Sequence, residues 1–369
     1  MIVSTKIRLE PNNKQKTKLF KSSSVARWAY NWTIGKQKEN YKNTGKFTPD
    51  SELRKELTQL KKTEEYSWLY EVSNNVTKQA IKDACEAYKR FFKKQSKYPR
   101  FKSKKRSKPA FYNDSVKLKV KSNKVLVEKV GWIKTSELLP VSKLYNPRIT
   151  FDGLHWYISV GVEIELENQK LEGCIGVDLG VKELAVISTG EVIPNINKSQ
   201  KMKKLEKRKK KLQKKVSKKY QNNKKGESYV KTNKIRKLEN KLLKISRKIT
   251  NIRKDYIHKF TTSLVKTKPE RIVIEDLNTR GMLKNHKLAR VIQEQSFREI
   301  RTQLVYKTEM NGIELVIADR FYPSSKTCSH CGYVKPKLSL SERTFTCECC
   351  GLEIDRDYNA ALNLSAYVV

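Results

Sequence analysis

In the stretch GCIGVDLGVKELAVIS, residues 173–188, one carboxylate, Asp178, lies in the middle of the most apolar run of the chain. Its first half predicts a short apolar strand, and the following VKELAVIS and EVI predict two more strands, so Asp178 falls on the first strand of a three-stranded meander. An acid at a strand end is commonly only a turn former. The rest of the chain has to show whether Asp178 has another role.

The charge of the chain points to a polyanionic partner. The 369 residues include 80 Lys and Arg against 38 Asp and Glu, a net charge of +42. Like charge at this density repels itself unless a polyanion neutralises it, which favours nucleic acid and argues against a neutral small-molecule enzyme. No apolar run approaches the ~18 residues of a membrane span, and residues 1–10 lack the apolar core of a signal peptide. We therefore expect a cytoplasmic, nucleoid-associated protein with no membrane partner.

The N-terminal half alternates between strand and helix patterns. Residues 1–10 predict one strand that ends at Pro11, and residues 15–98 carry a helical pattern. Two segments between 111 and 162 have the alternating pattern and turn residues of β-hairpins. They are VKLKVKSNKVLVEKV, with Asn at its turn, and NPRITFDGLHWYISVGVE, with Asp-Gly at its turn. Together these patterns predict a small β-barrel that is interrupted by helices.

A basic helical hairpin is predicted in the second half. The segment 201–254 holds 24 basic and three acidic residues, a net +21, which is half the charge of the chain. Its apolar residues follow helical spacing in two stripes, which are Met202, Leu205, Leu212 and Val216, and Ile235, Leu238, Leu242, Ile245, Ile249 and Ile252. A solvated coiled coil is the plainer interpretation. Phosphates are the better partner, because so few acids are present to pair with the lysines.

Further acids stand beside two apolar elements. Glu275 and Asp276 follow a short apolar strand, residues 271–274, and Asp357 precedes a helical pattern, where its plain role would be an N-cap. Together with Asp178 these acids could converge at one edge of a mixed sheet. Their mutual repulsion would then demand cations, and hard divalent metals with oxygen ligands fit such a cluster. Two Mg²⁺ ions can bind the attacking and leaving oxygens of a phosphodiester and activate water, so the acids favour a nuclease.

The cysteines give the most specific local motif. CSHC at 328–331 and CECC at 347–350 are separated by 15 residues, and this spacing predicts a structural zinc site formed by Cys328, Cys331, Cys347 and Cys350. The matching C-x-x-C-G in both halves favours Cys350, although Cys349 remains an alternative as the fourth ligand. His330 is interpreted as a filler, and the isolated Cys85 and Cys174 as small buried side chains.

The order of these motifs resembles a known family. GVDLGVKELAV, the basic hairpin, IEDLN, YPSSKTCSHCG, F-T-C-x-x-C-G and DRDYNAALNL together resemble the TnpB proteins encoded by insertion sequences, which are compact relatives of the type V CRISPR effector nucleases. RLEPNNKQ, ARWAYNW, PRFKSKK and GWIKT are similar to the N-terminal half of that family. The chain continues only five residues beyond Leu364, so a longer C-terminal tail of relatives is expected to be missing.

The resemblance implies an α/β nuclease combined with all-β and helical parts. It implies an RNase-H-like RuvC domain whose acids correspond to Asp178, Glu275 and Asp357, with Asp357 preferred over Asp355. The implied ranges are a wedge-type β-barrel at 1–10 and 99–165, a helical recognition lobe at 11–98, the RuvC-like domain at 173–327 and 351–369 with the basic hairpin inserted at 199–258, and a zinc ribbon at 328–350.

The implied activity is RNA-guided cleavage of double-stranded DNA beside a short adjacent motif. The implied cofactors are a structural Zn²⁺, catalytic Mg²⁺, with two ions expected, and a guide RNA transcribed from the transposon end. Base pairing with the guide would recognise the target sequence, so the protein surface can consist mainly of positive charge without base-specific side chains. The alternatives are a guided DNA-binding protein that does not cut, which would be expected to lose acids of the trio, and a transposase or accessory nucleic-acid-binding protein.

A face for reading the duplex motif is predicted in the helical lobe. In VSNNVTKQA, Asn75 and Gln79, and likewise Asn74 and Lys78, are four residues apart and therefore neighbours on a helix. Amide side chains can bond adenine edges with two hydrogen bonds. A solvated polar face is the alternative interpretation.

Overall fold

The computed structural model describes residues 1–140, 143–166, 170–339 and 341–368. The chain divides into two compact units, Met1–Glu165 and Leu166–Val369. Residues 141–142, 340 and 369, which fall within three of the predicted domain ranges, lie outside the described residues. In the described part of the chain, no helix is both long and apolar enough to span a membrane.

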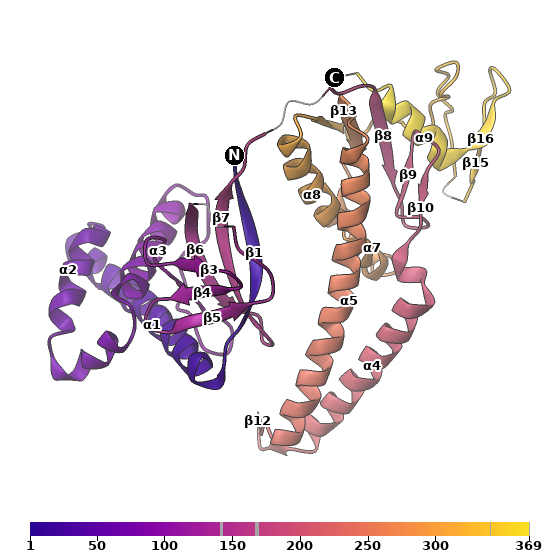
Figure 1. Ribbon diagram of the computed structural model, residues 1–369. Coiled ribbons are helices and arrows are strands. Elements are labelled where there is room, and N and C mark those ends of the chain that lie inside the picture. The colour runs from indigo at the N-terminus through magenta and orange to yellow at the C-terminus, as the bar shows by residue number, and fades with distance from the viewer. Residues whose placement is uncertain (141–142, 167–169, 340, 369) are drawn as a thin grey trace. The chain divides into compact units, whose positions relative to one another are not determined.

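The first unit combines a sheet with helices (Figure 1). Its elements in chain order are β1 (Ile2–Glu10), α1 (Asn13–Thr44), α2 (Asp50–Leu60), the 3₁₀ helix η1 (Glu64–Glu71), α3 (Asn74–Phe92), β2 (Ala110–Tyr112), β3 (Lys119–Lys121), β4 (Lys124–Val127), β5 (Gly131–Thr135), β6 (Leu144–Phe151) and β7 (Trp156–Glu163). The first strand, the helical region and both hairpins are therefore confirmed.

The seven strands form one curled sheet in the order β2-β6-β7-β1-β5-β4-β3. The N-terminal strand β1 is central, because it pairs antiparallel with both β7 and β5. The predicted barrel is an open half-barrel in the described residues, since the edge strands β2 and β3 are three residues long and each pairs with one neighbour. Ile7 and Leu9 of the sheet share one buried core with Leu19 and Ile34 of α1 and with Ile81 of α3.

The boundaries of α1 follow from its sequence. Asn12 caps its start by accepting a hydrogen bond from the Gln15 backbone N–H at 2.9 Å, and the Gln15 side chain returns a bond to the Asn12 backbone N–H at 3.0 Å. The helix ends at Gly45, whose φ of 67° lies in the left-handed region that favours glycine. These signals explain why a single helix of 32 residues forms directly after Pro11.

The second unit is built around a mixed sheet. Its elements are β8 (Cys174–Leu179), β9 (Ala185–Ile187), β10 (Val192–Ile193), the 3₁₀ helix η2 (Ile196–Lys198), α4 (Gln200–Gln221), β11 (Lys224–Lys225), β12 (Ser228–Tyr229), α5 (Asn233–Lys266), β13 (Arg271–Glu275), α6 (Thr279–Met282), α7 (Ala289–Gln295), α8 (Phe297–Met310), β14 (Glu314–Ala318), β15 (Thr344–Thr346), β16 (Glu353–Asp355) and α9 (Arg356–Ser365).

The five main strands have the order β10-β9-β8-β13-β14. The predicted antiparallel meander is confirmed as β8-β9-β10, and β13 and β14 run parallel to β8. One face of the sheet shares a core with α5, α7 and α8, and the other face packs against α9. The mixed sheet is therefore sandwiched between two helical layers (Figure 1).

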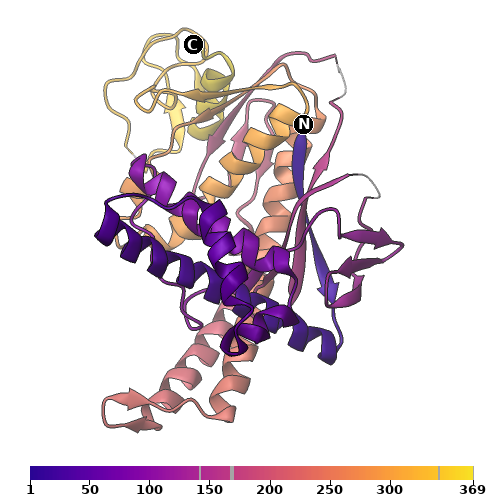
Figure 2. The ribbon, with the colours of Figure 1, turned by 90° about the vertical axis from the view of Figure 1, so that its left-hand side faces the viewer.

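The basic hairpin is formed by α4 and α5, which extend together away from the sheet in both views (Figures 1 and 2). Met202, Ile245 and Ile249 are buried in its seam, and Leu205, Leu212 and Ile252 are packed against them, which confirms these six members of the predicted stripes. Helix α5 continues to Lys266, beyond the predicted end of the hairpin at 258. Its last turns, with Phe260 and Leu264, belong to the core of the sheet, so one helix serves both the hairpin and the core.

Candidate active site and metal centre

Two predicted acids lie on neighbouring parallel strands. Side chains alternate between the faces of a strand, and in β8 Ile175, Val177 and Leu179 face the core that contains α5 and α8. Asp178 therefore faces α9. In β13, Ile272 and Ile274 share that same core, so Glu275 also faces α9. Because Ile274 pairs with Val177, Glu275 follows one residue later, level with Asp178.

Helix α9 brings the third acid to this face. A Cβ on Gly176 of β8 would lie 2.1 Å from the Ala361 carbonyl oxygen and 2.4 Å from the Ser365 backbone nitrogen, so only glycine permits this approach. Asp357 stands in the first turn of α9. The close packing of α9 against β8 thus places Asp357 near the ends of β8 and β13.

The electrostatics of the three carboxylates indicate one cluster. The pKa of Asp178 is raised well above its usual value, first by burial and then by the negative charges of Glu275 and Asp357. Burial also raises the pKa of Glu275, and the charge of Asp357 adds to this, whereas a hydrogen bond from Ser324 opposes it. The structure therefore gathers three acids whose charges disfavour one another and which gain from a cation.

Glu275 and Asp357 have different side-chain neighbours. The Ser324 hydroxyl donates to Glu275 Oε1 at 2.6 Å. The guanidinium of Arg356 lies 3.2 Å from Asp357 Oδ1, and that of Arg343 lies 3.7 Å from Asp357 Oδ2. Two carboxylates are thus already oriented by side chains of the described structure, one by a hydroxyl and one by arginines.

Asp276 and Asp355 have structural partners. Asp276 pairs with Arg301 at 3.0 Å and with Arg320, and these partners lower its pKa. The N-cap of α9 is Asp355, whose Oδ1 accepts from the backbone N–H groups of Asp357 and Tyr358 at 2.9 and 3.0 Å. The capping role considered for Asp357 is therefore wrong, because the helix begins at Arg356 and Asp357 already lies within its first turn.

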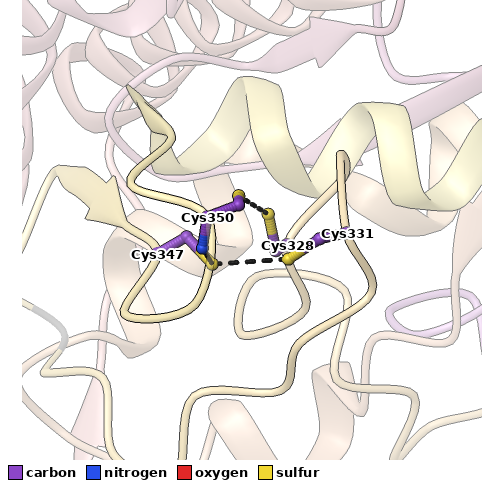
Figure 3. A group of neighbouring side chains, drawn as sticks. All are labelled: Cys328, Cys331, Cys347 and Cys350. Atoms are coloured by element: carbon purple, nitrogen blue, oxygen red, sulfur yellow. Dashed lines mark hydrogen bonds between the residues drawn. The ribbon is translucent and has the colours of Figure 1, made fainter.

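The four predicted cysteines form a compact metal-ligand cluster (Figure 3). The sulfur atoms of Cys328, Cys331, Cys347 and Cys350 all lie within 4.8 Å of one another. The Cys328–Cys350 and Cys331–Cys347 sulfur pairs are 3.6 Å apart, far longer than a disulfide bond. Four sulfurs at about 2.3 Å from a tetrahedral Zn²⁺ would be separated by about 3.8 Å, so the cluster fits zinc.

Both knuckles have the same backbone geometry. Gly332 donates to the Cys328 carbonyl at 3.0 Å, and Gly351 donates to the Cys347 carbonyl at 3.1 Å. The two glycines have φ values of 77° and 75°, which is why glycine follows each C-x-x-C. The backbone N–H groups of Cys350 and Cys349 donate to Cys347 Sγ and lower the pKa of that thiol to about 6, which favours the thiolate that a metal needs.

The cluster resolves the choice between the adjacent cysteines. Cys350, and not Cys349, is the fourth member of the sulfur group, and His330 is not part of it. Cys85 is buried as expected, whereas Cys174 is only half-buried at the start of β8. In the described residues, no group of three carboxylates is as compact as the four thiols, so the acids are more widely spaced than the ligands of one closed metal cage.

Two asparagines of α9 connect the cysteine cluster to the acids. Asn359 accepts from the Ser329 backbone N–H at 3.0 Å and donates to the Thr327 carbonyl at 2.7 Å. Asn363 donates to the carbonyl groups of Ser324 and Thr327 at 2.7 and 2.6 Å. The segment that leads into the first knuckle, and that carries the Ser324 partner of Glu275, is therefore fastened to the helix of Asp357.

Sequence reasoning did not select Ser324, Gly176 or these asparagines as site residues. Their motifs, YPSSKTC, GVDLG and YNAALNL, were visible, but no ligand chemistry distinguished them. The spacing of Asn359 and Asn363 by four residues is the one signal that could have indicated a shared helix face. Their partner, however, comes from a segment more than 30 residues earlier in the chain.

The residues predicted to read the duplex motif lie in the first two turns of α3. Asn74 and Lys78 are exposed, and Asn75 and Gln79 are half-buried. Asn74 Oδ1 accepts from Lys61 at 2.6 Å, and Asn75 Nδ2 lies 3.4 Å from Glu128 Oε2. Gln79 Nε2 donates to Asp83 at 2.9 Å. A base edge that binds here has to share or replace these intramolecular bonds.

Comparisons with known proteins cover almost the whole chain. Three family models match: "Helix-turn-helix domain" at residues 1–46, "Probable transposase" at 157–286 and "Cas12f1-like, TNB domain" at 297–364. A protein of Streptomyces pristinaespiralis, named "Putative RNA-guided DNA endonuclease", is 33% identical over 98% of this chain and 88% of its own length. InsQ of Escherichia coli K12, with the same descriptive name, is 30% identical over 98% of this chain and 91% of its own length.

A solved structure supports the fold. The structure titled "Structure of the mini-RNA-guided endonuclease CRISPR-Cas_phi3" matches 99% of this chain and 92% of that chain with a TM-score of 0.53 and 11% sequence identity. At this identity the likeness concerns the fold alone.

Proposed function

This chain belongs to the TnpB family, whose curated members are named RNA-guided DNA endonucleases, and from this membership we propose that it cuts DNA at sites selected by a bound guide RNA. The observation that carries the proposal is the convergence of Asp178, Glu275 and Asp357 at one edge of a mixed sheet. Burial and mutual repulsion raise the pKa values of Asp178 and Glu275, a combination expected where a cation completes the site.

The chemistry of the three acids fits Mg²⁺. Their ligand atoms are all carboxylate oxygens, which hard divalent cations prefer. Asp178, Glu275 and Asp357 would hold two Mg²⁺ ions, which would supply water activation and charge stabilisation for phosphodiester hydrolysis. The strands β8 and β13 hold two of the carboxylates on rigid core elements, as such chemistry requires.

Neighbouring side chains prepare the acids for this role. Ser324 fixes one oxygen of Glu275 and leaves the orientation of the carboxylate defined. Arg356 and Arg343 lie beside Asp357 and balance its negative charge.

In this proposal the second unit holds the RuvC-like, RNase-H-like nuclease domain, at 173–327 and 351–369, with the zinc ribbon at 328–350. Cys328, Cys331, Cys347 and Cys350 hold Zn²⁺ in a closed site of four thiolates, which serves folding rather than catalysis. Through Asn359 and Asn363 the ribbon keeps the Ser324 segment and the helix of Asp357 in register. The zinc therefore stabilises the acid site indirectly.

The first unit supplies the wedge-type sheet, at 1–10 and 99–165, and the helical recognition lobe at 11–98. Asn74, Asn75, Lys78 and Gln79 are the residues proposed to contact the adjacent motif of the target duplex. The basic hairpin, with its lysine-rich outer faces, is suited to the phosphates of guide RNA and target DNA. We propose a transcript of the transposon end as the guide.

Replacing Asp178 by Ala tests the nuclease assignment. The variant should lose cleavage of both DNA strands while it still binds guide RNA and target, because those contacts are made by basic surfaces outside the acid cluster. Glu275→Ala and Asp357→Ala should behave alike, and Asp355→Ala should be milder, because it removes only a helix cap worth about 1 kcal/mol.

Glu314→Ala is a matched control, since it removes an exposed carboxylate from the start of β14, at the opposite end of the same sheet. All variants need the same guide, target and salt concentration, because phosphate binding is steeply salt-dependent. Near wild-type cutting by Asp178→Ala, or loss of guided binding together with cutting, would contradict the assignment. Guided binding without cutting by the wild-type protein would favour the alternative of a guided DNA-binding protein.

A further inference from the structure

Phe321 is the most exposed large apolar side chain in the described part of the chain, with 87% of its surface accessible. It lies in the segment 319–324, between β14 and the first cysteine knuckle. Exposing an aromatic ring of this size to water is unfavourable by the transfer free energy of its apolar surface. A single exposed aromatic ring is common on protein surfaces and does not by itself indicate a binding site. The residues around Phe321 therefore have to be considered.

The backbone around Phe321 is held firmly. The Phe321 N–H donates to Asp319 Oδ1 at 2.7 Å. The next ring, Tyr322, packs edge to face on Tyr367 with centroids 4.8 Å apart, and its hydroxyl donates to the Asn363 carbonyl at 3.2 Å. Phe321 is thus presented to solvent by an anchored turn, while the residue beside it is tied to the C-terminal helix.

On both sides of Phe321 the same turn contacts acidic residues at the end of β13. Arg320, the preceding residue, pairs with Asp276, and Ser324, three residues later, donates to Glu275. Glu275 and Asp276 are consecutive residues at the end of β13. The turn that carries the exposed ring therefore contacts the candidate active site through Ser324 and Glu275, and contacts the neighbouring Asp276 through Arg320.

The surroundings are suited to a nucleic acid strand. Glu275 also borders a cavity of about 700 Å³, which Leu179, Arg298 and Arg301 help to line. Arg301 connects this cavity to the turn, because it shares Asp276 with Arg320. Arginines at the cavity and at the turn can pair with phosphates, and an aromatic ring offers a flat apolar face to a base.

We propose that Phe321 stacks on an unpaired nucleobase of the DNA strand held at the three carboxylates, an inference that rests on the proposed function. In a duplex each base is covered by its neighbours, so only an unpaired or extruded base offers its face to the ring. The contact would fix the strand next to the phosphodiester that is cut. Stacking is tolerant of base identity, as a nuclease guided by base pairing requires.

The test combines a protein change with a DNA change. Zinc-loaded, guide-bound wild type and Phe321→Ala are assayed in single-turnover cleavage on an intact target strand and on strands with one abasic site placed at each position around the cut in turn. Phe321→Ala should slow cutting of the intact strand by about 5- to 150-fold, the range that loss of one base–aromatic contact produces.

The two changes should not add. At one position the abasic site should slow the wild type by a similar factor, and Phe321→Ala should cut that strand no more slowly than the intact one. Phe321→Trp should retain the wild-type rate, and all variants should keep the wild-type melting temperature because the ring is exposed. Phe101→Ala, which removes another exposed aromatic ring from the first unit, should show no such coupling to any abasic position.

Wild-type cutting by Phe321→Ala would overturn this inference alone. Slowing that is the same on intact and on every abasic strand would also overturn it, because the ring would then contact protein or backbone rather than a base. Failure of the guided wild-type protein to cut the intact target would refute the proposed function, and this inference with it.

Discussion

The contact between α9 and β8 at Gly176 offers a sharp test of the site. In Gly176→Ala the new Cβ would lie 2.1 Å from the Ala361 carbonyl oxygen, whereas ordinary contact begins at 3.4 Å, so α9 would have to retreat by the difference of 1.3 Å. The contacted atoms belong to the backbone, and no flexible side chain can yield. We expect a loss of about 3 kcal/mol, the upper end of typical overpacking costs.

A shift of this size should be measurable in two ways. For a unit of this length, about 3 kcal/mol lowers the melting temperature by roughly 6–12 °C in a thermal scan. Because α9 carries Asp357, a displacement of about 1 Å should also slow single-turnover cleavage by about 100-fold at temperatures where the variant is folded. Both effects follow from the same contact, so they should appear together.

Gly35→Ala is the matched control. Gly35 lies inside α1, and a Cβ there would meet nothing within 4 Å. The same substitution should therefore stabilise the protein by about 0.5–1 kcal/mol, because alanine favours a helix interior over glycine. If Gly176→Ala melted and cut like the wild type, α9 would not pack on β8 in this way, and the placement of Asp357 beside Asp178 would be wrong.

Two further predictions concern the zinc and the acids. Cys328→Ser should reduce the zinc content from about one ion per chain and destabilise the second unit, whereas Cys349→Ser should keep the metal; equal zinc loss in both variants, measured by elemental analysis, would contradict the ligand assignment. The folded-state pKa of Asp178 is raised, so its relative stabilising contribution is present below its unfolded pKa of about 3.9 and is lost as the pH rises through the folded pKa. In magnesium-free buffer Asp178→Asn should therefore melt higher than the wild type at pH 7, with an advantage that shrinks toward pH 4, and a constant difference across this range would show that charge is not the cause.

Local sequence patterns were sufficient to predict most of the helices and strands. Alternation predicted β1 and the hairpins of the first unit, and the 3-4 spacing of apolar residues predicted the hairpin of α4 and α5, because each pattern reports a face that must be buried. The cysteine spacing predicted the sulfur cluster, since a knuckle is formed within a few residues. These features depend on neighbours in the chain, which the sequence displays directly.

Other features were not predictable from composition or from the spacing of residues. The N-cap of α9 was first considered for Asp357, but the helix begins two residues earlier than that role requires and Asp355 is the N-cap, because boundaries depend on local backbone geometry that composition does not specify. The barrel is open, because strand closure depends on the lengths of β2 and β3. No local signal indicated that Ser324 would orient Glu275.

The sequence by itself therefore determined the types of element and the cysteine knuckles, and it singled out the acids that we propose as metal ligands, since alternation, helical spacing and ligand spacing are local properties. Only the tertiary structure decided that Asp178 and Glu275 lie side by side, because this requires β13 to pair in parallel with β8 across almost 100 residues. It also decided that α9 can approach through Gly176 and bring Asp357 with it. Register and packing depend on contacts between distant segments, and these become defined only when the core closes.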